Sequence, residues 1–371
     1  MERSPVLPLD GTGLEALVLG TGPRPAQATG DPAAEPAGYL VAMDGGVRIH
    51  FLDWGGPALR DGTAQASAAP WGAGISARPG RPDVPGVLLI HGLARTAWSW
   101  SPVARLLGAD ARVAAMDLRG HGLSDAPTDG YDPDQLAEDA IAVAEGAGLL
   151  ALEDDPLAEG SPGGRRFVVA GHGYGAIVAA WAANALGDRC SGLVLVDGGW
   201  TDRPAETEMT PDEWLAAIAE PPEVLASMAA WLADREAFDP ATWVPDGERA
   251  ARSEVVETAA GRVKLAIHGH ALAASVGAMW TFEPRAVLPA VEAGIVALAA
   301  RDDDAGRHLA ALREVAALRA GAGRPAIRAA AFPRLGHDLP RHVPGVVAAA
   351  ILAAARGTPD ADRGTLDGAS G

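Results

Sequence analysis

Short apolar runs alternate with longer amphipathic stretches along most of this chain. The runs are typical of buried strands, being short, rich in β-branched residues and ended by Gly or Asp; they are Val47–Trp54, Val87–His91, Arg112–Met116, Phe167–Ala170, Leu193–Val196, Val296–Ala299 and Ile327–Phe332. Between them, helical spacing of apolar residues recurs at Trp98–Leu107, Pro133–Ala147, Ala176–Leu186, Ala305–Arg319 and Val343–Ala355. Apolar strands separated by helices predict an α/β fold, in which helices cover both faces of a mostly parallel sheet.

The alternation is interrupted once, after Val196, where residues 201 to about 289 are helical in pattern, charged and rich in Trp. A helical insertion between two sheet strands is typical of a cap. We therefore expect a core of residues 37–199 and 290–356 with a cap of residues 200–289. Segments 1–36, 57–85 and 357–371 are rich in Gly, Pro and Ala without a sustained period, which predicts loop or disorder.

Composition narrows the range of partners. The 371 residues include 30 Lys and Arg against 48 Asp and Glu, which gives a formal net charge of −18. Such a surface repels phosphate backbones and anionic lipid heads, so nucleic acid and membrane surfaces are not expected partners. The longest run of small apolar residues, Val346–Ala355, is about half as long as a bilayer requires. No apolar segment of signal-peptide length follows Met1, so a cytoplasmic protein is expected.

Four local motifs follow one another in the order expected of a known fold. They are Leu88-Leu89-Ile90-His91-Gly92-Leu93, Asp117-Leu118-Arg119-Gly120-His121-Gly122, Ala170-Gly171-His172-Gly173-Tyr174-Gly175 and Arg334-Leu335-Gly336-His337-Asp338. Together they resemble the α/β-hydrolase superfamily over about residues 38–356. The resemblance is to the capped branch, with epoxide hydrolases, haloalkane dehalogenases, haloperoxidases and small esterases and lactonases. It implies the α/β-hydrolase fold, with the cap inserted after the sixth strand.

One position departs from the pattern of that family. In the family, the turn after the fifth strand is Gly-x-Ser-x-Gly or Gly-x-Asp-x-Gly, and its central residue is the nucleophile. Here the central residue is Gly173, between Gly171 and Gly175. Because glycine has no side chain, no covalent acyl- or alkyl-enzyme can form at this position. The preceding His172 is expected to have a structural role, with its side chain pointing into the fold.

No other hydroxyl is well placed to replace the missing nucleophile. Tyr174 is the only hydroxyl residue within the turn, and the family directs this side chain away from the pocket. Ser99, Ser101 and Ser124 belong to other segments, none of which is a strand-to-helix turn that would expose a hydroxyl beside a histidine. A relocated nucleophile is therefore not expected.

The resemblance implies that other parts of the catalytic machinery are retained. His337 matches the catalytic histidine after the final strand. Alignment with the Gly-x-x-Asp of the family assigns the acid to Asp304, with Asp302 or Asp303 as alternatives after a slip of one or two residues, and Asp197 ranks next. The acidic run after Arg301 also fits a solvated charge cluster or a helix N-terminus.

Backbone amides are expected to form the oxyanion hole. In the family these amides belong to the residue after His-Gly and the residue after the nucleophile, which here are Leu93 and Tyr174. Backbone donors persist when a side chain is deleted, so a carbonyl oxygen could still be held there.

The expected cap is rich in large apolar side chains. Trp200, Trp214, Trp231, Trp243 and Trp280 all lie within it or at its start. Each is more readily explained as packing, but together they favour a cleft that suits an apolar small molecule.

Neither a metal nor a cofactor is expected. His268 and His270 have no ligand partners at metal-site spacing, and the single cysteine, Cys190, excludes both an internal disulfide and a cysteine cluster.

These observations leave the activity open. The resemblance implies a hydrolase of the ester, lactone or epoxide class, whereas Gly173 predicts that covalent catalysis is absent. An Asp–His pair without a nucleophile could still activate a water molecule. The alternatives are a binding protein that retains the pocket without catalysis, and an esterase in which serine was deliberately replaced by Gly173.

Overall fold

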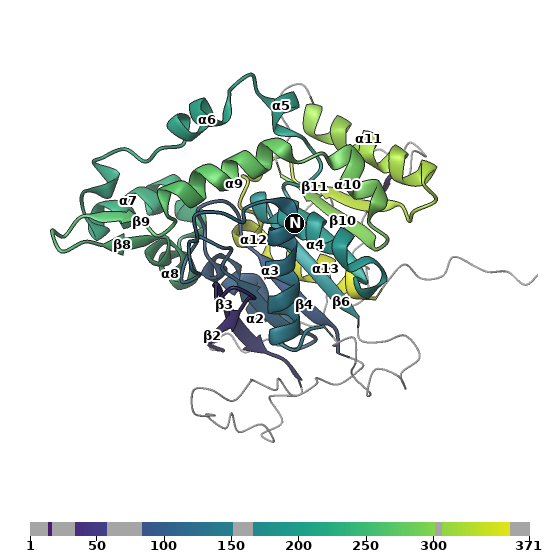
Figure 1. Cartoon of the computed structure of the whole chain (residues 1–371), viewed down its shortest axis with the longest axis horizontal. Coiled ribbons are helices and arrows are strands. Elements are labelled where there is room, and N and C mark those ends of the chain that lie inside the picture. Colours follow the sequence, from purple (N-terminus) through teal and green to yellow (C-terminus); the bar gives the residue numbers. More distant parts are fainter. Residues whose placement is uncertain (1–13, 17–33, 58–83, 151–165, 301–305, 357–371) are drawn as a thin grey trace, which may run out of the picture.

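The computed structural model describes residues 14–16, 34–57, 84–150, 166–300 and 306–356. Its main feature is a nine-stranded sheet with the order β1-β11-β10-β7-β6-β4-β5-β3-β2 (Figure 1). The strands are β1 (Leu14–Ala16), β2 (Ala37–Ala42), β3 (Arg48–Gly55), β4 (Gly86–Ile90), β5 (Arg112–Met116), β6 (Phe167–His172), β7 (Gly192–Val196), β10 (Gly294–Ala299) and β11 (Ile327–Ala331). Neighbours from β1 to β5 run parallel, whereas β3 pairs antiparallel with β5 and β2.

Helices cover both faces of this sheet and form a hydrophobic core on each face. Successive residues of one strand therefore belong alternately to the two cores. In β4, Leu88 and Ile90 belong to one core and Val87 and Leu89 to the other. The first core contains α3 (Pro133–Gly146), α4 (Tyr174–Leu186) and α11 (Arg307–Gly321), and the second contains α2 (Ser101–Leu107) and α13 (Pro344–Ala355). The predicted α/β architecture, a mostly parallel sheet between two helical layers, is confirmed.

Between β7 and β10 the chain leaves the sheet, in the region predicted as a cap. Its elements are α5 (Arg203–Glu206), α6 (Pro211–Ala217), α7 (Met228–Phe238), α8 (Pro245–Ser253), β8 (Val255–Glu257), β9 (Val263–Leu265), α9 (Gly269–Thr281) and α10 (Pro284–Ala290). Figure 1 shows α6, α7, α9 and the β8–β9 hairpin extending beyond one end of the sheet.

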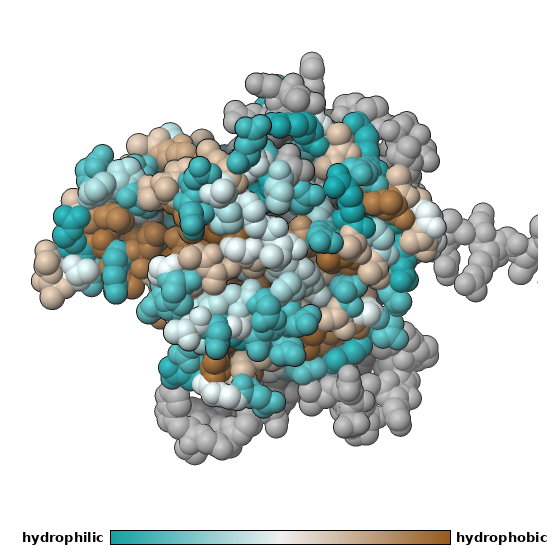
Figure 2. Space-filling view, turned by 45° about the horizontal axis from the view of Figure 1, so that its top comes forward, coloured by the Kyte–Doolittle hydropathy of each residue, from teal (hydrophilic) through white to brown (hydrophobic). Residues whose placement is uncertain are grey.

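The cap tryptophans differ in their surroundings. Trp231 is 1% exposed and packs with Val255 and Val263 in a small core of the cap itself, and its indole N–H donates to the carbonyl of Ala251 at 2.7 Å. Trp200, also 1% exposed, belongs to the main core. These two rings therefore stabilise the fold instead of presenting an aromatic wall. Figure 2 shows apolar side chains gathered on the surface at its left, where Figure 1 places α7, β8 and β9. Among the cap residues, Phe238 of α7 and Val256 of β8 are exposed.

Two expectations from the sequence were wrong in detail. The region predicted to be helical includes the antiparallel β8–β9 hairpin, whose strands of three residues each are too short to show a period. Leu14–Ala16, within the predicted loop of residues 1–36, pairs with β11 as an edge strand. The remaining loop predictions, for residues 1–13, 17–33, 58–83 and 357–371, lie outside the described residues.

Among the helices described, none combines the length and the apolar character that a membrane span requires.

Candidate active site

The tight turn from β6 to α4 determines the geometry of the site. Gly173 lies between these elements with φ of +54° and ψ of −116°, a left-handed conformation that L side chains rarely adopt. A Cβ added at Gly171 would lie 2.0 Å from the carbonyl oxygen of Gly175, and one added at Gly175 would lie 2.3 Å from that of Ile90. Both flanking positions therefore require glycine, because the backbones approach too closely for any side chain.

The environment of Gly173 is different. A Cβ built there would lie 3.0 Å from His337 Nε2 and 3.3 Å from Cε1, with the next heavy atom, Gly92 Cα, at 4.0 Å. The nearest atoms therefore belong to a side chain that is 60% exposed and would have to shift by a few tenths of an ångström to make room for a Cβ. No backbone atom outside the turn lies closer than 4.0 Å to this Cβ, so the main steric limit at position 173 is the imidazole, at which the side chain would point.

His337 is held on its other side by a carboxylate. Its Nδ1 lies 2.6 Å from Oδ2 of Asp197, at the end of β7, and Oδ1 of Asp197 accepts the backbone N–H of Ala300 at 2.7 Å. Asp197 is 8% exposed and has φ of +46°, a strained value for a residue other than glycine. A proton on Nδ1, shared with Asp197, leaves the Nε2 lone pair facing Gly173.

Asp197 was the second-ranked acid in the sequence analysis. The structure pairs it with His337, whereas the preferred Asp304 and its neighbours Asp302 and Asp303 lie outside the described residues. The sequence signal for Asp197 was its position directly after a buried strand, since the family also places its catalytic acid after a strand of the sheet.

His172 supports His337 from behind. Its Nε2–H donates to the backbone carbonyl of His337 at 3.0 Å, and the two rings lie 4.4 Å apart between centroids. Burial, together with the nearby charge of His337, lowers the pKa of His172 to about 4. It is therefore neutral near pH 7 and positions the catalytic candidate without competing for its proton.

The amides predicted for the oxyanion hole are free to donate. Within the described part of the chain, neither the Leu93 nor the Tyr174 N–H has a hydrogen-bond partner. Tyr174 is the first residue of α4, where the helix dipole adds partial positive charge. Leu93 lies in a turn closed by the Arg95 N–H donating to the carbonyl of Gly92 at 3.1 Å.

Three of the four hydroxyls considered from the sequence are engaged elsewhere, and the fourth is buried. Ser99, Ser101 and Ser124 donate to the backbone carbonyls of Thr96, Trp98 and Asp117 at 2.7–2.8 Å. The Tyr174 hydroxyl is fully buried, and burial raises its pKa. Among the described contacts, none of the four hydroxyls is hydrogen-bonded to His337.

Metal-type clusters are not found among the described residues: no group of three or more His, Cys, Asp and Glu could hold an ion there. His270 donates through Nε2 to the carbonyls of Ala126 and Pro127, and His268 stacks edge-on against it. The prediction that the protein uses no cofactor stays a prediction.

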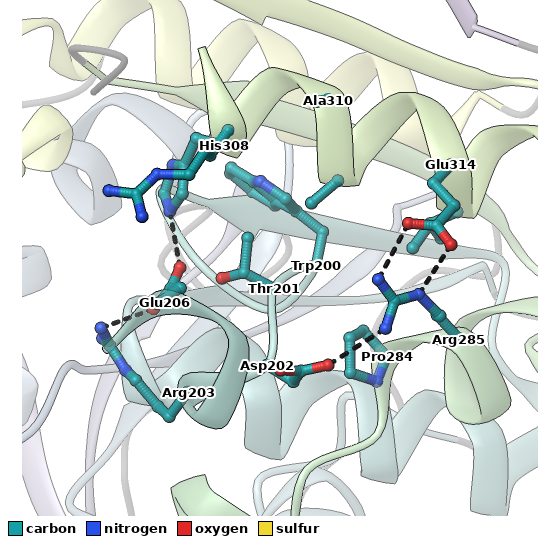
Figure 3. A pocket seen from close by; sticks show the side chains of 13 residues that line it. Trp200, Thr201, Asp202, Arg203, Glu206, Pro284, Arg285, His308, Ala310 and Glu314 are labelled. Atoms are coloured by element: carbon teal, nitrogen blue, oxygen red, sulfur yellow. Dashed lines mark hydrogen bonds and ion pairs between the residues drawn. The ribbon is translucent and has the colours of Figure 1, made fainter. Parts of the chain in front are cut away.

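A hollow of about 530 Å³ lies apart from these residues, between α5, the start of α10 and α11 (Figure 3). Two ion-pair groups border it: Glu206 with Arg203 and His308 at 2.7 and 3.1 Å, and Arg285 with Glu314 at 2.8 Å. Neither Gly173 nor His337 lines it. The arrangement of polar groups, and not the size of a cavity, therefore identifies the candidate active site.

Comparison with known proteins gives a consistent assignment. A sequence model described as the alpha/beta hydrolase family matches residues 87–350. The AB hydrolase superfamily protein YfhM of Bacillus subtilis is 35% identical over 106 residues, which are 28% of this chain and 32% of that protein, so the match spans about a third of the relative's length.

Solved structures show the same fold. An E-2-(acetamidomethylene)succinate hydrolase superposes with a TM-score of 0.58 at 18% identity, covering 86% of this chain and 98% of the other. An alpha/beta hydrolase from Novosphingobium aromaticivorans superposes with a TM-score of 0.57 at 21% identity, covering 87% and 99%. At such identities the likeness concerns the fold alone.

Proposed function

The chain belongs to the alpha/beta hydrolase family, and on that premise we propose that Asp197 and His337 activate a water molecule against the carbonyl group of a small apolar ester or lactone. The observation that carries the proposal is the orientation of His337. Its Nδ1 is bonded to Asp197 at 2.6 Å, and its Nε2 faces the point, 3.0 Å away, where a nucleophile side chain would begin.

The reaction needs no covalent intermediate. His337 Nε2 removes a proton from water as the oxygen attacks the carbonyl carbon, and Asp197 stabilises the imidazolium that forms. The oxyanion of the tetrahedral intermediate accepts hydrogen bonds from the amides of Leu93 and Tyr174. When the tetrahedral intermediate collapses, the bond to the leaving alkoxide breaks, and the alkoxide takes from His337 the proton that came from water.

The rate should be low for this fold. General-base catalysis contributes roughly 10²–10⁴-fold, and hydrolases that lose a triad residue keep about 10³–10⁴-fold over water through binding and the oxyanion hole. Slow hydrolysis that depends on His337 is therefore the expected activity.

Apolar residues near the site favour an apolar substrate. Ala94, next to Leu93, packs in a small cluster with Leu265 and Leu272 of the cap, around the buried Ile267 and Ala271. The cap and the turn that contains Leu93 thus contact each other through apolar side chains. We therefore expect the acyl part of the substrate to bind between the cap and the sheet.

The decisive test is hydrolysis of nitrophenyl butyrate by the unmodified chain and by His337→Ala. We expect the variant to lose the enzyme-dependent rate, while His268→Ala, an exposed histidine of the cap, serves as the matched control and keeps it. Equal rates for the unmodified chain and His337→Ala would exclude water activation by this residue.

Gly173 also supports a second function, that of a binding protein without turnover. A ligand would then raise the melting temperature, with no product detected after prolonged incubation. The geometry also fits an esterase whose serine has been replaced by glycine, and the sequence of the encoding gene separates this case.

A further inference from the structure

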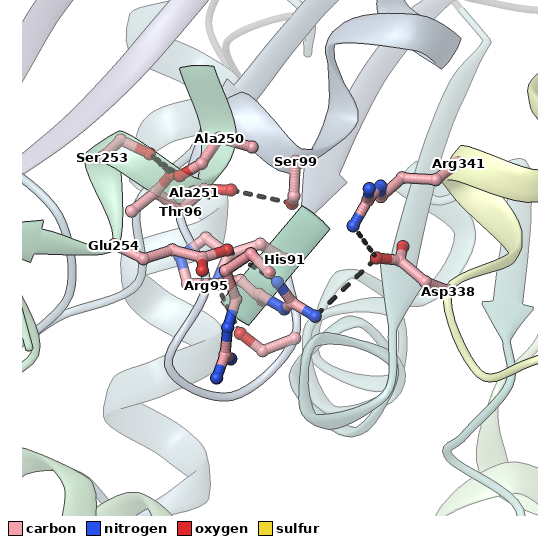
Figure 4. Close-up of polar contacts among 12 residues, drawn as sticks. His91, Arg95, Thr96, Ser99, Ala250, Ala251, Ser253, Glu254, Asp338 and Arg341 are labelled. Atoms are coloured by element: carbon pink, nitrogen blue, oxygen red, sulfur yellow. Dashed lines mark hydrogen bonds and ion pairs between the residues drawn. The ribbon is translucent and has the colours of Figure 1, made fainter. Parts of the chain in front are cut away.

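Arg95 lies two residues after Leu93 and belongs to a polar cluster where the cap meets the core (Figure 4). Its Nη1 donates to Oε1 of Glu254 at 2.8 Å, and its Nη2 lies 3.7 Å from Oδ2 of Asp338. Glu254 follows α8 of the cap, and Asp338 follows His337. One guanidinium thus contacts the cap and the loop that carries the catalytic candidate.

Both carboxylates are shielded from water. The side chain of Glu254 is 3% exposed and that of Asp338 is 16% exposed. Burial opposes the ionisation of Asp338, but nearby positive charges, that of Arg95 first and that of Arg341 among the others, outweigh it and lower the pKa of Asp338. Arg95 therefore neutralises two shielded carboxylates, Glu254 of the cap and Asp338 of the core, each of which would be costly to bury without a counter-charge.

The contact of Arg95 with the cap lies next to a strained turn of the backbone, the turn that contains Leu93. Ala94 has φ of +58°, a conformation that an alanine holds only where its surroundings impose it. The Arg95 N–H closes the turn onto Gly92, and the hydroxyls of Thr96 and Ser253 are 2.5 Å apart. The strained turn that presents the Leu93 amide is thus fastened to the end of α8 at two consecutive residues.

We propose that Arg95 is a positioning residue: through Glu254 it fastens the turn that carries the Leu93 amide to the cap, so that the donor geometry of the oxyanion hole depends on the position of the cap. This inference rests on the proposed role of Leu93. It predicts that loss of Arg95 impairs recognition of an oxyanion more than recognition of a neutral carbonyl.

The chain offers a matched control. Arg105 of α2 also pairs with the cap, at 2.9 Å from Asp246 of α8, and its side chain is 11% exposed. Arg105→Met removes an ion pair between the same cap helix and the core without touching the turn that contains Leu93. A simple loss of cap anchoring would affect both arginine variants alike.

The experiment measures binding by calorimetry of two non-hydrolysable probes, an alkyl methylphosphonate anion and a neutral ketone of the same shape. Arg95→Met should weaken phosphonate binding about tenfold, as a displaced donor does, and ketone binding less than twofold. Arg95→Lys should restore most of the difference, and Arg105→Met should not produce it. Equal losses for both probes, or for both arginine variants, would overturn the proposal.

Two additions keep the test decisive. Because Arg95→Met leaves Glu254 buried without a counter-charge, the double variant Arg95→Met with Glu254→Gln is measured as well and should show the same selective loss. Amide hydrogen exchange at Arg95 should accelerate at least about tenfold in Arg95→Met but not in Arg105→Met. If the unmodified chain binds no phosphonate, the proposed function fails, while unchanged exchange at Arg95 would refute the positioning role on its own.

Discussion

His337 and Asp197 are separated by 140 positions in the sequence and by 2.6 Å in the structure. The same imidazole has its other nitrogen 3.0 Å from the point where a side chain at position 173 would begin. A carboxylate, an imidazole and position 173 are therefore aligned in the order that the acid, the base and the nucleophile of a catalytic triad would take.

Gly173→Ser should restore a covalent esterase. Serine Oγ would lie within reach of His337 Nε2 after the imidazole moves by a few tenths of an ångström. We expect hydrolysis of nitrophenyl butyrate to rise on the order of 10²-fold or more, with a burst of nitrophenol that reports the acyl-enzyme. The left-handed backbone should lower the free energy of unfolding by about 1–3 kcal/mol.

Gly187→Ser is the control for that strain. Gly187 has φ of +56° and ψ of −125°, close to the angles of Gly173, and no atom lies within 4 Å of a Cβ built there. It should be destabilised to a similar extent without gaining activity. If Gly173→Ser folds and stays as slow as the unmodified chain, the oxyanion hole and the Asp–His pair are not aligned for catalysis.

Asp197→Asn should remove most of the activity gained by Gly173→Ser. The amide can still accept the N–H of Ala300 through Oδ1, but it cannot stabilise the imidazolium or hold the Nδ1 proton, which costs roughly 10³–10⁴-fold in related triads. The rates of Asp197→Asn and Asp304→Asn are compared in the Gly173→Ser background. A large loss confined to Asp304→Asn would assign the acid to the residue first favoured by the sequence.

Lowering the pH should reduce the free energy of unfolding, because buried histidines take up protons when the chain unfolds. Burial lowers the pKa of His121 to about 3 and that of His172 to about 4, compared with about 6.5 in the unfolded chain. As the pH falls below 6.5 the unfolded state binds these protons first, so stability is full above pH 6.5 and decreases down to about pH 3–4. At pH 5, His121 alone should cost about 2 kcal/mol.

Urea unfolding at a series of pH values checks this dependence. His121→Asn should reduce the slope of the curve between pH 4 and pH 6.5, leaving the part that His172 contributes, whereas the same replacement of the exposed His268 should leave the slope unchanged. A curve for the unmodified chain that is flat over this interval would show that neither His121 nor His172 takes up a proton on unfolding.

The sequence predicted those parts of the fold and site that depend on local pattern. Alternating apolar runs predicted the mostly parallel sheet, which is confirmed. The turn around Gly173 and His337 were both predicted as parts of one site, and the structure brings them together. The pairing of Asp197 with His337 could not be read from local pattern, because Asp197 and Asp304 both come after a predicted strand and only the tertiary arrangement brings a carboxylate to the imidazole. The preference for Asp304, which lies outside the described residues, stays a prediction. The contact of Arg95 with Glu254, 159 positions away, leaves no local signal at all.

Arg319 should be one of the most sensitive structural positions outside the site. Its side chain is fully buried and donates to the carbonyls of Leu288, Val291 and Ala293, so it satisfies the end of α10, and burial lowers its pKa to about 10. Arg319→Met should cost about 3 kcal/mol of unfolding free energy, because it leaves buried carbonyls unpaired. Arg285→Met, which breaks an ion pair whose two side chains are both 51% exposed, should cost less than about 1 kcal/mol. Similar urea midpoints for the two variants would mean that other donors or water can satisfy the end of α10.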